Sequence, residues 1–436
     1  MRKAAFHVFL IACVLLMSSC GHRESKPKPP AGSAKAKLPA SSGWPMFRAD
    51  ERNSGYAAVK GPSKPAVLWK SKPIYENASM FCDVSPVLGE DGTLYCSARD
   101  AAYAIEPGGK TRWMLENVGG TWRGSPLGGR YSPAVARDGT VYIATRHFVS
   151  DFPINTYLPG RLCAVDRDGR LLWTYEEGEP TAYLLLDKRG SLYAIVDSQA
   201  ASSREPSYLA VIDDKGKTVR KVRLPEGGIV GWGLSHITLR NTSTGTHAYC
   251  AAGNTVCRID PAGGLLTVSL GVPTTEYGYA PSITGLSVSI EPDAVYVCTD
   301  DGGLTRLSAS SLNTEWQIKA GDKARFVNPA VSGDGVYVIT DLRRLSCVGH
   351  DGKIRWKVDL PVETYSSPAV DKEGSVFVTG GGKLFCVGSD GKIKWDIVVS
   401  KERWVSSPIL GPDGTVYCYS DRVCAVGEAR RAGGKP

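Results

Sequence analysis

The chain has 436 residues, of which 49 are glycine and 27 proline, and few stretches show helical periodicity. This composition suits many turns and short strands rather than packed helices. The net charge of +8 comes from the ends, because residues 1–20 carry +2, residues 21–43 carry +4 and residues 428–436 carry +2, which leaves residues 44–427 neutral. Nucleic-acid binding needs clustered Lys and Arg and is therefore not expected of residues 44–427.

The first 20 residues predict an export signal. Arg2 and Lys3 precede an apolar run from Ala4 to Met17, which is too short for a membrane-spanning helix. The run is followed by Ser-Ser-Cys, so the Met-Ser-Ser-Cys ending resembles a bacterial lipobox and predicts that Cys20 becomes the lipid-modified first residue of the mature chain. An ordinary cleaved signal with an incidental cysteine is the alternative.

Residues 21–43 follow this cysteine and are rich in Pro, Ala, Ser and Lys. Such a sequence cannot build a core, so it predicts a flexible tether between the lipid and the folded domain. Gly21 directly after Cys20 resembles lipoproteins that are sent to the outer membrane, and the basic residues 428–436 predict a disordered tail. We therefore expect an exported lipoprotein, attached to the outer membrane or cell surface through its lipid only.

Residues 44–427 are built from repeats. The segment DGKIRWKVDL (351–360) returns as DGKIKWDIVV (390–399), and related segments end at Trp113 and Trp173. A second unit, SPAVARDGTVYIAT at 132–145, also recurs and is typical of a strand, a glycine turn and a second strand. The aromatic residue of that second strand appears at Tyr95, Tyr142, Tyr193, Tyr249, Tyr296, Tyr337, Phe377 and Tyr417. These eight copies, 40 to 56 residues apart, predict an all-β, eight-bladed β-propeller with four antiparallel strands per blade.

Both ends of the repeat region are expected to contribute to one blade. The last repeat supplies three strands within residues 406–427 and no fourth, whereas KPAVLWK at 64–70 is a lone strand before the first complete repeat. We expect the Trp69 strand to join the C-terminal blade, which would leave no open edge in the ring.

The cysteines follow the repeat rather than a metal-ligand spacing. Nine of them lie beside the blade aromatic or in the third strand, which predicts small buried residues between blades. Two pairs, Cys250 with Cys257 and Cys418 with Cys424, would face each other across hairpins, where disulfides are the alternative to free thiols. No histidines of the repeat region have metal-ligand spacing, so we expect no metal site and no cofactor.

Long connections gather on one face of the expected propeller. Extra residues occur between second and third strands, as at 146–160 and 197–208, and between blades, as at 116–130 and 271–281. In a four-stranded blade these connections emerge on the same rim, while the other turns stay short. Seven aromatic residues precede the innermost strands on that side, namely Phe81, Tyr131, Trp232, Tyr279, Phe326, Tyr365 and Trp404. They predict an exposed rim that binds a peptide segment or a sugar chain, with wedge packing between blades as the alternative.

The segment GWPMFRADERNSGYA (43–57), the lone VLWK strand and the repeat A-[VI]-[DE]-x-x-G-[KR]-x-x-W resemble the quinoprotein-type (PQQ-like) eight-bladed propellers over residues 44–427. In that family each blade tryptophan docks against the neighbouring blade. The resemblance assigns this role to Trp69, Trp113, Trp173, Trp316, Trp356 and Trp395. Arg220 and Thr267 replace the tryptophan in two blades, where we expect looser contacts or another form of stabilisation.

The resembling family has two branches, quinone-dependent dehydrogenases and non-enzymatic binders. The enzymes carry a Cys-Cys pair against the cofactor and hold calcium with acidic and amide ligands, whereas this sequence has no Cys-Cys dipeptide and no matching acidic cluster. We therefore expect no catalytic residues and a similarity to the lipoprotein of the outer-membrane β-barrel assembly machinery. The expected role is a monomeric envelope scaffold that binds another protein through the loop-rich face. The alternatives are binding of surface polysaccharide and, less favoured, a PQQ-dependent dehydrogenase.

Overall fold

The computed structural model of the protein describes residues 43–74, 85–98, 101–116, 131–151, 154–181, 183–197, 207–225, 236–270, 282–323 and 327–429. These residues belong to one unit of the chain, Leu38–Pro436. The predicted export signal with Cys20 and the predicted tether up to residue 42 lie outside the described residues. The disordered tail was predicted from residue 428, but Glu428 is the last residue of a strand and the backbone N–H of Ala429 donates to the carbonyl of Lys64 at 2.7 Å, so only residues 430–436 of it lie outside the described residues. Within the described ranges, no helix is long and apolar enough to cross a membrane.

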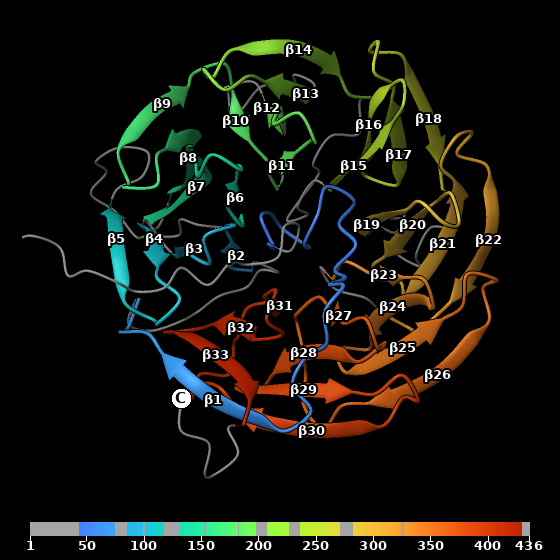
Figure 1. The fold of residues 1–436 in the computed structure, drawn as a ribbon. Helices are drawn as coiled ribbons and strands as arrows, with labels where there is room; N and C mark the ends of the chain where they lie inside the picture. Colours follow the sequence, from blue (N-terminus) through green and yellow to red (C-terminus); the bar gives the residue numbers. More distant parts are fainter. Residues whose placement is uncertain are drawn as a thin grey trace, which may run out of the picture. The chain divides into compact units, whose positions relative to one another are not determined.

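Eight antiparallel sheets follow one another around a ring, each with its first strand at the centre and its last strand at the periphery (Figure 1). We number the sheets as blades 1–8 and call the strand positions A to D from the centre outward. Blade 1 consists of β2 (Val87–Leu88), β3 (Leu94–Ala98), β4 (Ala101–Ile105) and β5 (Thr111–Glu116), and blade 2 of β6 (Ala134–Val135), β7 (Val141–Asp151), β8 (Ile154–Val165) and β9 (Leu171–Tyr175). Blade 3 consists of β10 (Glu179–Pro180), β11 (Leu185–Leu186), β12 (Leu192–Asp197), β13 (Tyr208–Ile212) and β14 (Thr218–Arg223). Blade 4 consists of β15 (Ile237–Thr242), β16 (Gly245–Ala252), β17 (Thr255–Ile259) and β18 (Leu265–Ser269).

Blade 5 consists of β19 (Ile283–Ser289), β20 (Ala294–Thr299), β21 (Gly303–Ser308) and β22 (Thr314–Lys319), and blade 6 of β23 (Ala330–Ser332), β24 (Gly335–Thr340), β25 (Arg344–Val348) and β26 (Ile354–Asp359). Blade 7 consists of β27 (Ala369–Val370), β28 (Val376–Gly380), β29 (Lys383–Val387) and β30 (Ile393–Val398). Blade 8 consists of β31 (Ile409–Leu410), β32 (Val416–Tyr419), β33 (Val423–Glu428) and β1 (Pro65–Lys70). In blade 8, β1 pairs antiparallel with β33, with Pro65 opposite Glu428 and Lys70 opposite Cys424. The predicted eight-bladed β-propeller is confirmed.

Blades 2 and 3 differ from the simple four-strand pattern. The innermost position of blade 3 is divided between β10 and β11, which both pair with β12. In blade 2 the expected loop at 146–160 is largely a continuation of the hairpin, because β7 runs to Asp151, opposite Ile154 of β8. A register shift between Thr145 and His147 separates this extension from the rest of the blade.

Burial follows strand position, because a blade is covered on both faces by its neighbours except at its outer edge. The inner strands β24 and β28 are buried along their whole length. The outer strands β26 and β30 are instead mixed, with Trp356 and Trp395 half-buried between exposed residues. The hydrophobic core is therefore divided between the blade interfaces.

The outer-strand tryptophans contact a turn of the neighbouring blade. A Cβ atom built on Gly391 would lie 2.8 Å from Cγ of Trp356, and Gly391 has a φ of +77°, so only glycine suits this position. Trp69 lies against Gly109 in the same way and so joins blade 8 to blade 1. The indole Nε1 atoms donate to backbone carbonyls of the next blade: Trp113 to Arg167 (2.9 Å), Trp173 to Asp214 (2.8 Å), Trp316 to His350 (2.9 Å), Trp356 to Ser389 (2.8 Å) and Trp395 to Pro62 (3.1 Å).

The two outer strands without this tryptophan make different contacts. Beside β14, which carries Arg220, a Cβ on Gly263 would meet only Cγ2 of Val222, at 3.9 Å. Beyond β18, which carries Thr267, the junction to blade 5 is bridged by the Tyr249 hydroxyl, which donates to the carbonyl of Ala309 at 2.9 Å. One junction is therefore more loosely packed, and the other has a hydrogen bond from a B strand.

Candidate functional site

The two faces of the ring differ in their connections. The A–B and C–D turns lie on one face, which we call the short-turn face, and the B–C and D–A connections lie on the other, which we call the loop face. A site on either face is therefore built from a different class of segment.

Residues 44–55 cross the centre of the ring (Figure 1). They lie near the short-turn face, because three residues that bond to them, Leu88, Val135 and Val370, are the last of their A strands. Six blades each donate a backbone N–H of the A strand to a carbonyl of this segment: Leu88 to Trp44 (2.7 Å), Val135 to Pro45 (2.7 Å), Leu239 to Glu51 (2.6 Å), Val288 to Arg52 (2.9 Å), Val331 to Ser54 (2.7 Å) and Val370 to Gly55 (2.8 Å). The segment thus satisfies inner-strand amides that the blades do not use among themselves.

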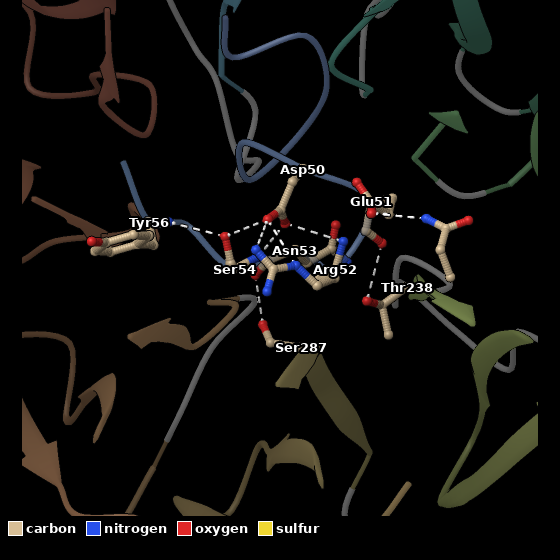
Figure 2. A network of polar contacts seen from close by, with 9 residues as sticks. Asp50, Glu51, Arg52, Asn53, Ser54, Tyr56, Thr238 and Ser287 are labelled. Atoms are coloured by element: carbon tan, nitrogen blue, oxygen red, sulfur yellow. Dashed lines mark hydrogen bonds and ion pairs between the residues drawn. The ribbon is translucent and has the colours of Figure 1, made fainter. Parts of the chain in front are cut away.

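Figure 2 shows how this segment is held in shape. The Asp50 carboxylate accepts from Nη2 of Arg52 at 2.5 Å and from the Ser54 hydroxyl at 3.0 Å. The Ser287 hydroxyl of blade 5 donates to the carbonyl of Asn53 at 2.8 Å. These contacts fix a tight turn at the ring axis. The polar residues of this segment near the short-turn face therefore have a structural role.

Arg48 connects the same segment to blades 6 and 7. Its guanidinium is 1% exposed and donates through Nη1 to the carbonyl of Pro368 at 2.5 Å and through Nη2 to that of Pro329 at 3.1 Å. A Cβ on Gly55 would lie 2.1 Å from Nη2, so the glycine makes room for the arginine. Residues 44–55 are not part of the blade repeat, so the repeat pattern could not predict their role.

Three of the seven predicted rim aromatics lie in the described residues. Phe81, Trp232, Tyr279 and Phe326 lie outside them. Tyr131 is fully buried and packs edge-on against Tyr183, at a centroid distance of 6.0 Å, while Tyr183 stacks on Phe47 of the central segment at 3.6 Å. Tyr131 therefore presents no surface to a ligand, contrary to the expected exposed rim, because the central segment packs against this cluster.

Tyr365 and Trp404 come together on the loop face, on the connections that lead into blades 7 and 8. Both are half-exposed, their ring centroids are 4.5 Å apart and the ring planes are inclined by 58°. The guanidinium of Arg403 lies 5.5 Å from the Trp404 ring and forms an ion pair with Glu363. Thr379, Gly380 and Val405 complete the lining of a shallow pocket.

Side-chain hydrogen bonds hold the two connections that carry this aromatic pair. The Ser420 hydroxyl donates to the carbonyl of Trp404 at 2.7 Å, and the Thr379 hydroxyl donates to the carbonyl of Ser406 at 2.8 Å. The Ser366 hydroxyl accepts from the backbone N–H of Thr379 at 2.9 Å. The aromatic pair is therefore presented in a fixed geometry, which lowers the entropy lost on binding.

The described residues do not fit a quinone and calcium site of the kind that the resemblance implies for the enzymes. The nine described cysteines are buried and free, and no two are adjacent. Among the described residues, no three His, Cys, Asp or Glu side chains are grouped to hold a metal ion. Burial raises the pKa of Cys96 and Cys298 to about 12, which suits packing residues rather than nucleophiles.

The cysteine pairs that were expected to face each other do so in the strand register. Cys250 is opposite Cys257, and Cys418 is opposite Cys424. All four are free thiols in this structure.

Comparison with known proteins places the fold. The solved structures similar to this chain include the quinohemoprotein alcohol dehydrogenase from Comamonas testosteroni (TM-score 0.66, 12% identity, 92% of this chain and 83% of that chain) and a europium-containing methanol dehydrogenase (0.61, 14%, 88% and 90%). They also include BamB from Moraxella catarrhalis (TM-score 0.58, 14% identity, 83% of this chain and 99% of that chain). At these identities the similarity shows the fold and does not separate enzymes from binders.

A search of curated proteins finds no match. A family model described as "Outer membrane protein assembly factor BamB" matches residues 205–357 and 343–431, just over half of the chain. The chain therefore belongs to the PQQ-like eight-bladed propeller family that this model describes.

Proposed function

We propose that the protein is a non-catalytic, monomeric scaffold, held in the bacterial envelope by a lipid on Cys20, that binds another protein through its loop face. The observation that carries this proposal is the half-exposed pair of Tyr365 and Trp404, which is held in one geometry at the shallow pocket between blades 7 and 8. Rigid, partly exposed aromatic residues with a neighbouring arginine are the composition of protein-binding hot spots.

The geometry of the pair supports a protein partner over a polysaccharide. The two rings are inclined by 58° and do not form a flat platform on which a sugar ring could stack. The pocket lining carries an ion pair between Arg403 and Glu363 and no amide side chain. An amino-acid side chain packed against the open side of the pair would contact both rings, beside the ion pair of Arg403 and Glu363.

Family membership supports the envelope part of the proposal. The matching family model and one of the similar structures both carry the name BamB, and the model's description is an outer membrane protein assembly factor. We extend this role to the present chain, with a protein of outer-membrane assembly as the partner. The lipid anchor on Cys20 and the tether of residues 21–43 would leave the propeller free to meet that partner away from the membrane surface.

Cross-linked capture from membranes tests the loop-face site. The full-length protein is compared with a Tyr365→Ala/Trp404→Ala variant and with a Leu171→Ala/Leu172→Ala variant, which removes exposed apolar area (64% and 51% exposed) from the outer strand of blade 2. We expect the wild type and the blade 2 variant to recover the same outer-membrane assembly protein, and the aromatic variant to recover about tenfold less. Equal recovery by all three, or recovery of polysaccharide alone, would contradict the proposal.

The anchor has its own test. Cys20→Ser in the full-length chain should abolish incorporation of labelled fatty acid and release the protein from the membrane fraction, because no second membrane attachment is proposed. Retention of the label in this variant would refute lipidation at Cys20.

A further inference from the structure

We propose that the outer edge of blade 3 is a second docking surface, which takes an extended acidic segment of a partner protein as an added strand on β14. This surface lies on the wall of the propeller and is independent of the loop-face site. Strand addition of this kind supplies main-chain hydrogen bonds, while side chains at alternate positions supply the selectivity.

The backbone of β14 offers an open edge. In its sheet β14 pairs with β13 on one side, and no described strand pairs with it on the other. Its residues alternate between half-buried and exposed, and Val219 is 62% exposed in the middle of the strand. A strand that joins this edge would therefore meet unpaired backbone groups and a central apolar contact.

The charge of this edge sets it apart from a neutral domain. The stretch 213–223 (DDKGKTVRKVR) holds five cations and two carboxylates. Lys215, Lys217 and Lys221 are exposed, and neither they nor Arg220 form an ion pair with a described residue. The Lys221 ammonium lies over the Tyr208 ring, 4.6 Å from its centroid. Both carboxylates precede the strand, and that of Asp213 accepts backbone N–H groups within its turn.

Among the described residues, each of the other charged outer strands except β1 contributes at least one side chain to an ion pair. On β22, Lys319 pairs with Asp301 at 2.9 Å, and on β5, Arg112 pairs with Asp91 at 3.3 Å. Beside β26, Arg344 pairs with Asp359 at 2.8 Å. The outer strands β9 and β18 contain no charged residue at all. The cations on β14 are therefore not a uniform device for keeping outer edges soluble.

The missing tryptophan contributes to the site. Arg220 stands where most other blades have the docking tryptophan, and the neighbouring Gly263 is approached only by Val222, at 3.9 Å. The junction between blades 3 and 4 is therefore less filled on its outer side than the tryptophan junctions. Where most other blades have an indole packed against the next blade, β14 has Arg220, which is half-buried at its edge.

Charge complementarity identifies the occupant. Two copies of the chain would bring like charges together along β14, which disfavours edge-to-edge pairing between them. A segment with Glu or Asp at alternate positions would instead place its carboxylates beside Lys217 and Lys221. The edge is one strand wide and offers backbone donors and acceptors, so it fits a peptide better than a flat membrane surface.

The probe is a seven-residue peptide, acetylated and amidated, in which Glu alternates with Thr and Val. Its binding to the full-length protein in nonionic detergent is measured by fluorescence anisotropy at about 0.1 M salt, where charges within a Debye length of about 10 Å still interact. A peptide with Lys in place of Glu reports the sign of the charge. The same acidic peptide with alternate backbone amides N-methylated keeps the charge and loses the ladder donors.

The test variant is Lys217→Glu/Lys221→Glu. The control is Lys353→Glu/Lys392→Glu, which makes the same charge change at side chains 79% and 82% exposed beside β26 and β30. We expect the acidic peptide to bind the wild type and the control alike, and to bind the test variant at least about tenfold more weakly. Hydrogen exchange of residues 218–223 should slow when the peptide is bound.

Four results would overturn the proposal. They are equal binding of the acidic peptide to both variants, equal binding of the N-methylated peptide, no binding of the acidic peptide, and binding of the wild type only to vesicles that contain anionic phospholipid. Equal melting temperatures of the two variants confirm that both are folded. Because none of these measurements involves Tyr365 or Trp404, the β14 surface can fail while the loop-face site stands, and the reverse.

Discussion

The glycine in each turn beneath a docking tryptophan should be more sensitive to substitution than a glycine with the same backbone in an open turn. Gly391 and Gly190 have φ angles of +77° and +86°, and the backbone N–H of each donates to the carbonyl three residues earlier, which closes a four-residue β-turn. Alanine at either site takes on the left-handed penalty of about 1–2 kcal/mol. At Gly190 the new methyl group finds no atom within 4 Å, so this penalty is the whole expected loss.

At Gly391 the new Cβ would lie 2.8 Å from Cγ and 2.9 Å from Cδ2 of Trp356. Carbon atoms prefer about 3.5–4.0 Å, so the indole must move. Overpacking of this kind costs about 1–3 kcal/mol. Displacement of the indole also weakens its hydrogen bond to Ser389, of 2.8 Å, which contributes about 1 kcal/mol. We expect Gly391→Ala to lower the free energy of unfolding by about 2–4 kcal/mol more than Gly190→Ala does.

Guanidinium unfolding of the chain without residues 1–20, followed by far-ultraviolet circular dichroism, measures both losses. A double-mutant cycle with Trp356→Leu isolates the contact, because in that background Gly391→Ala should cost only what Gly190→Ala costs. Equal losses for the two alanine variants in the wild-type background would show that backbone strain alone sets the sensitivity. The contact between tryptophan and glycine would then not be a main source of blade cohesion.

Three further predictions concern buried groups. Burial lowers the pKa of His236 to about 4, whereas in the unfolded chain this pKa has its ordinary value near 6.5. The unfolded chain therefore binds the proton more readily, so the stability that the neutral imidazole contributes is complete above about pH 6.5 and falls by up to about 3 kcal/mol as the pH drops to about 4. His236→Gln should remove this pH dependence, which unfolding measurements at both ends of the range would check. In a Cys82→Ser chain without residues 1–20, the nine described thiols should react with Ellman's reagent only after denaturation, and a lower count in the denatured chain would reveal a disulfide. Arg48→Met should lower the free energy of unfolding by about 2–4 kcal/mol, since it removes the donor to the buried carbonyl of Pro368 and one of the two donors to that of Pro329. Arg137→Met, at a side chain 84% exposed, should leave it nearly unchanged.

The repeated features of the fold could be predicted because each blade presents the same problem of packing. The ring centroids of Tyr337 and Trp356 lie 6.1 Å apart in blade 6, and those of Phe377 and Trp395 lie 5.9 Å apart in blade 7. One physical arrangement therefore selects the same residue types at the same spacing. A pattern that recurs every 40 residues or more is visible in a single sequence, so the blade number follows from it.

Features that occur once could not be predicted in this way. Arg48 bonds to Pro368, 320 residues further along the chain, and no local pattern records such a contact. Tyr131 and Tyr365 occupy similar places before inner strands, yet one is buried by the central segment and the other is half-exposed. Their difference depends on Phe47 and Tyr183, which the repeat does not specify.

The position of the cohesive contacts explains why the fold alone does not reveal the activity. The contacts between tryptophan and glycine lie near the periphery of the ring, so they hold the blades together whatever residues stand at the axis and on the loop face. Dehydrogenases and a BamB protein can therefore share this fold with the chain at 12–14% identity. Function has to be read from the residues that the repeat leaves free to differ. In this chain the axis near the short-turn face is taken by Arg48 and Asn53, which bond to backbone carbonyls of the blades. The half-exposed aromatic pair and the basic edge of β14, which we propose as binding surfaces, both lie away from those structural contacts, so a partner bound there would leave the ring undisturbed.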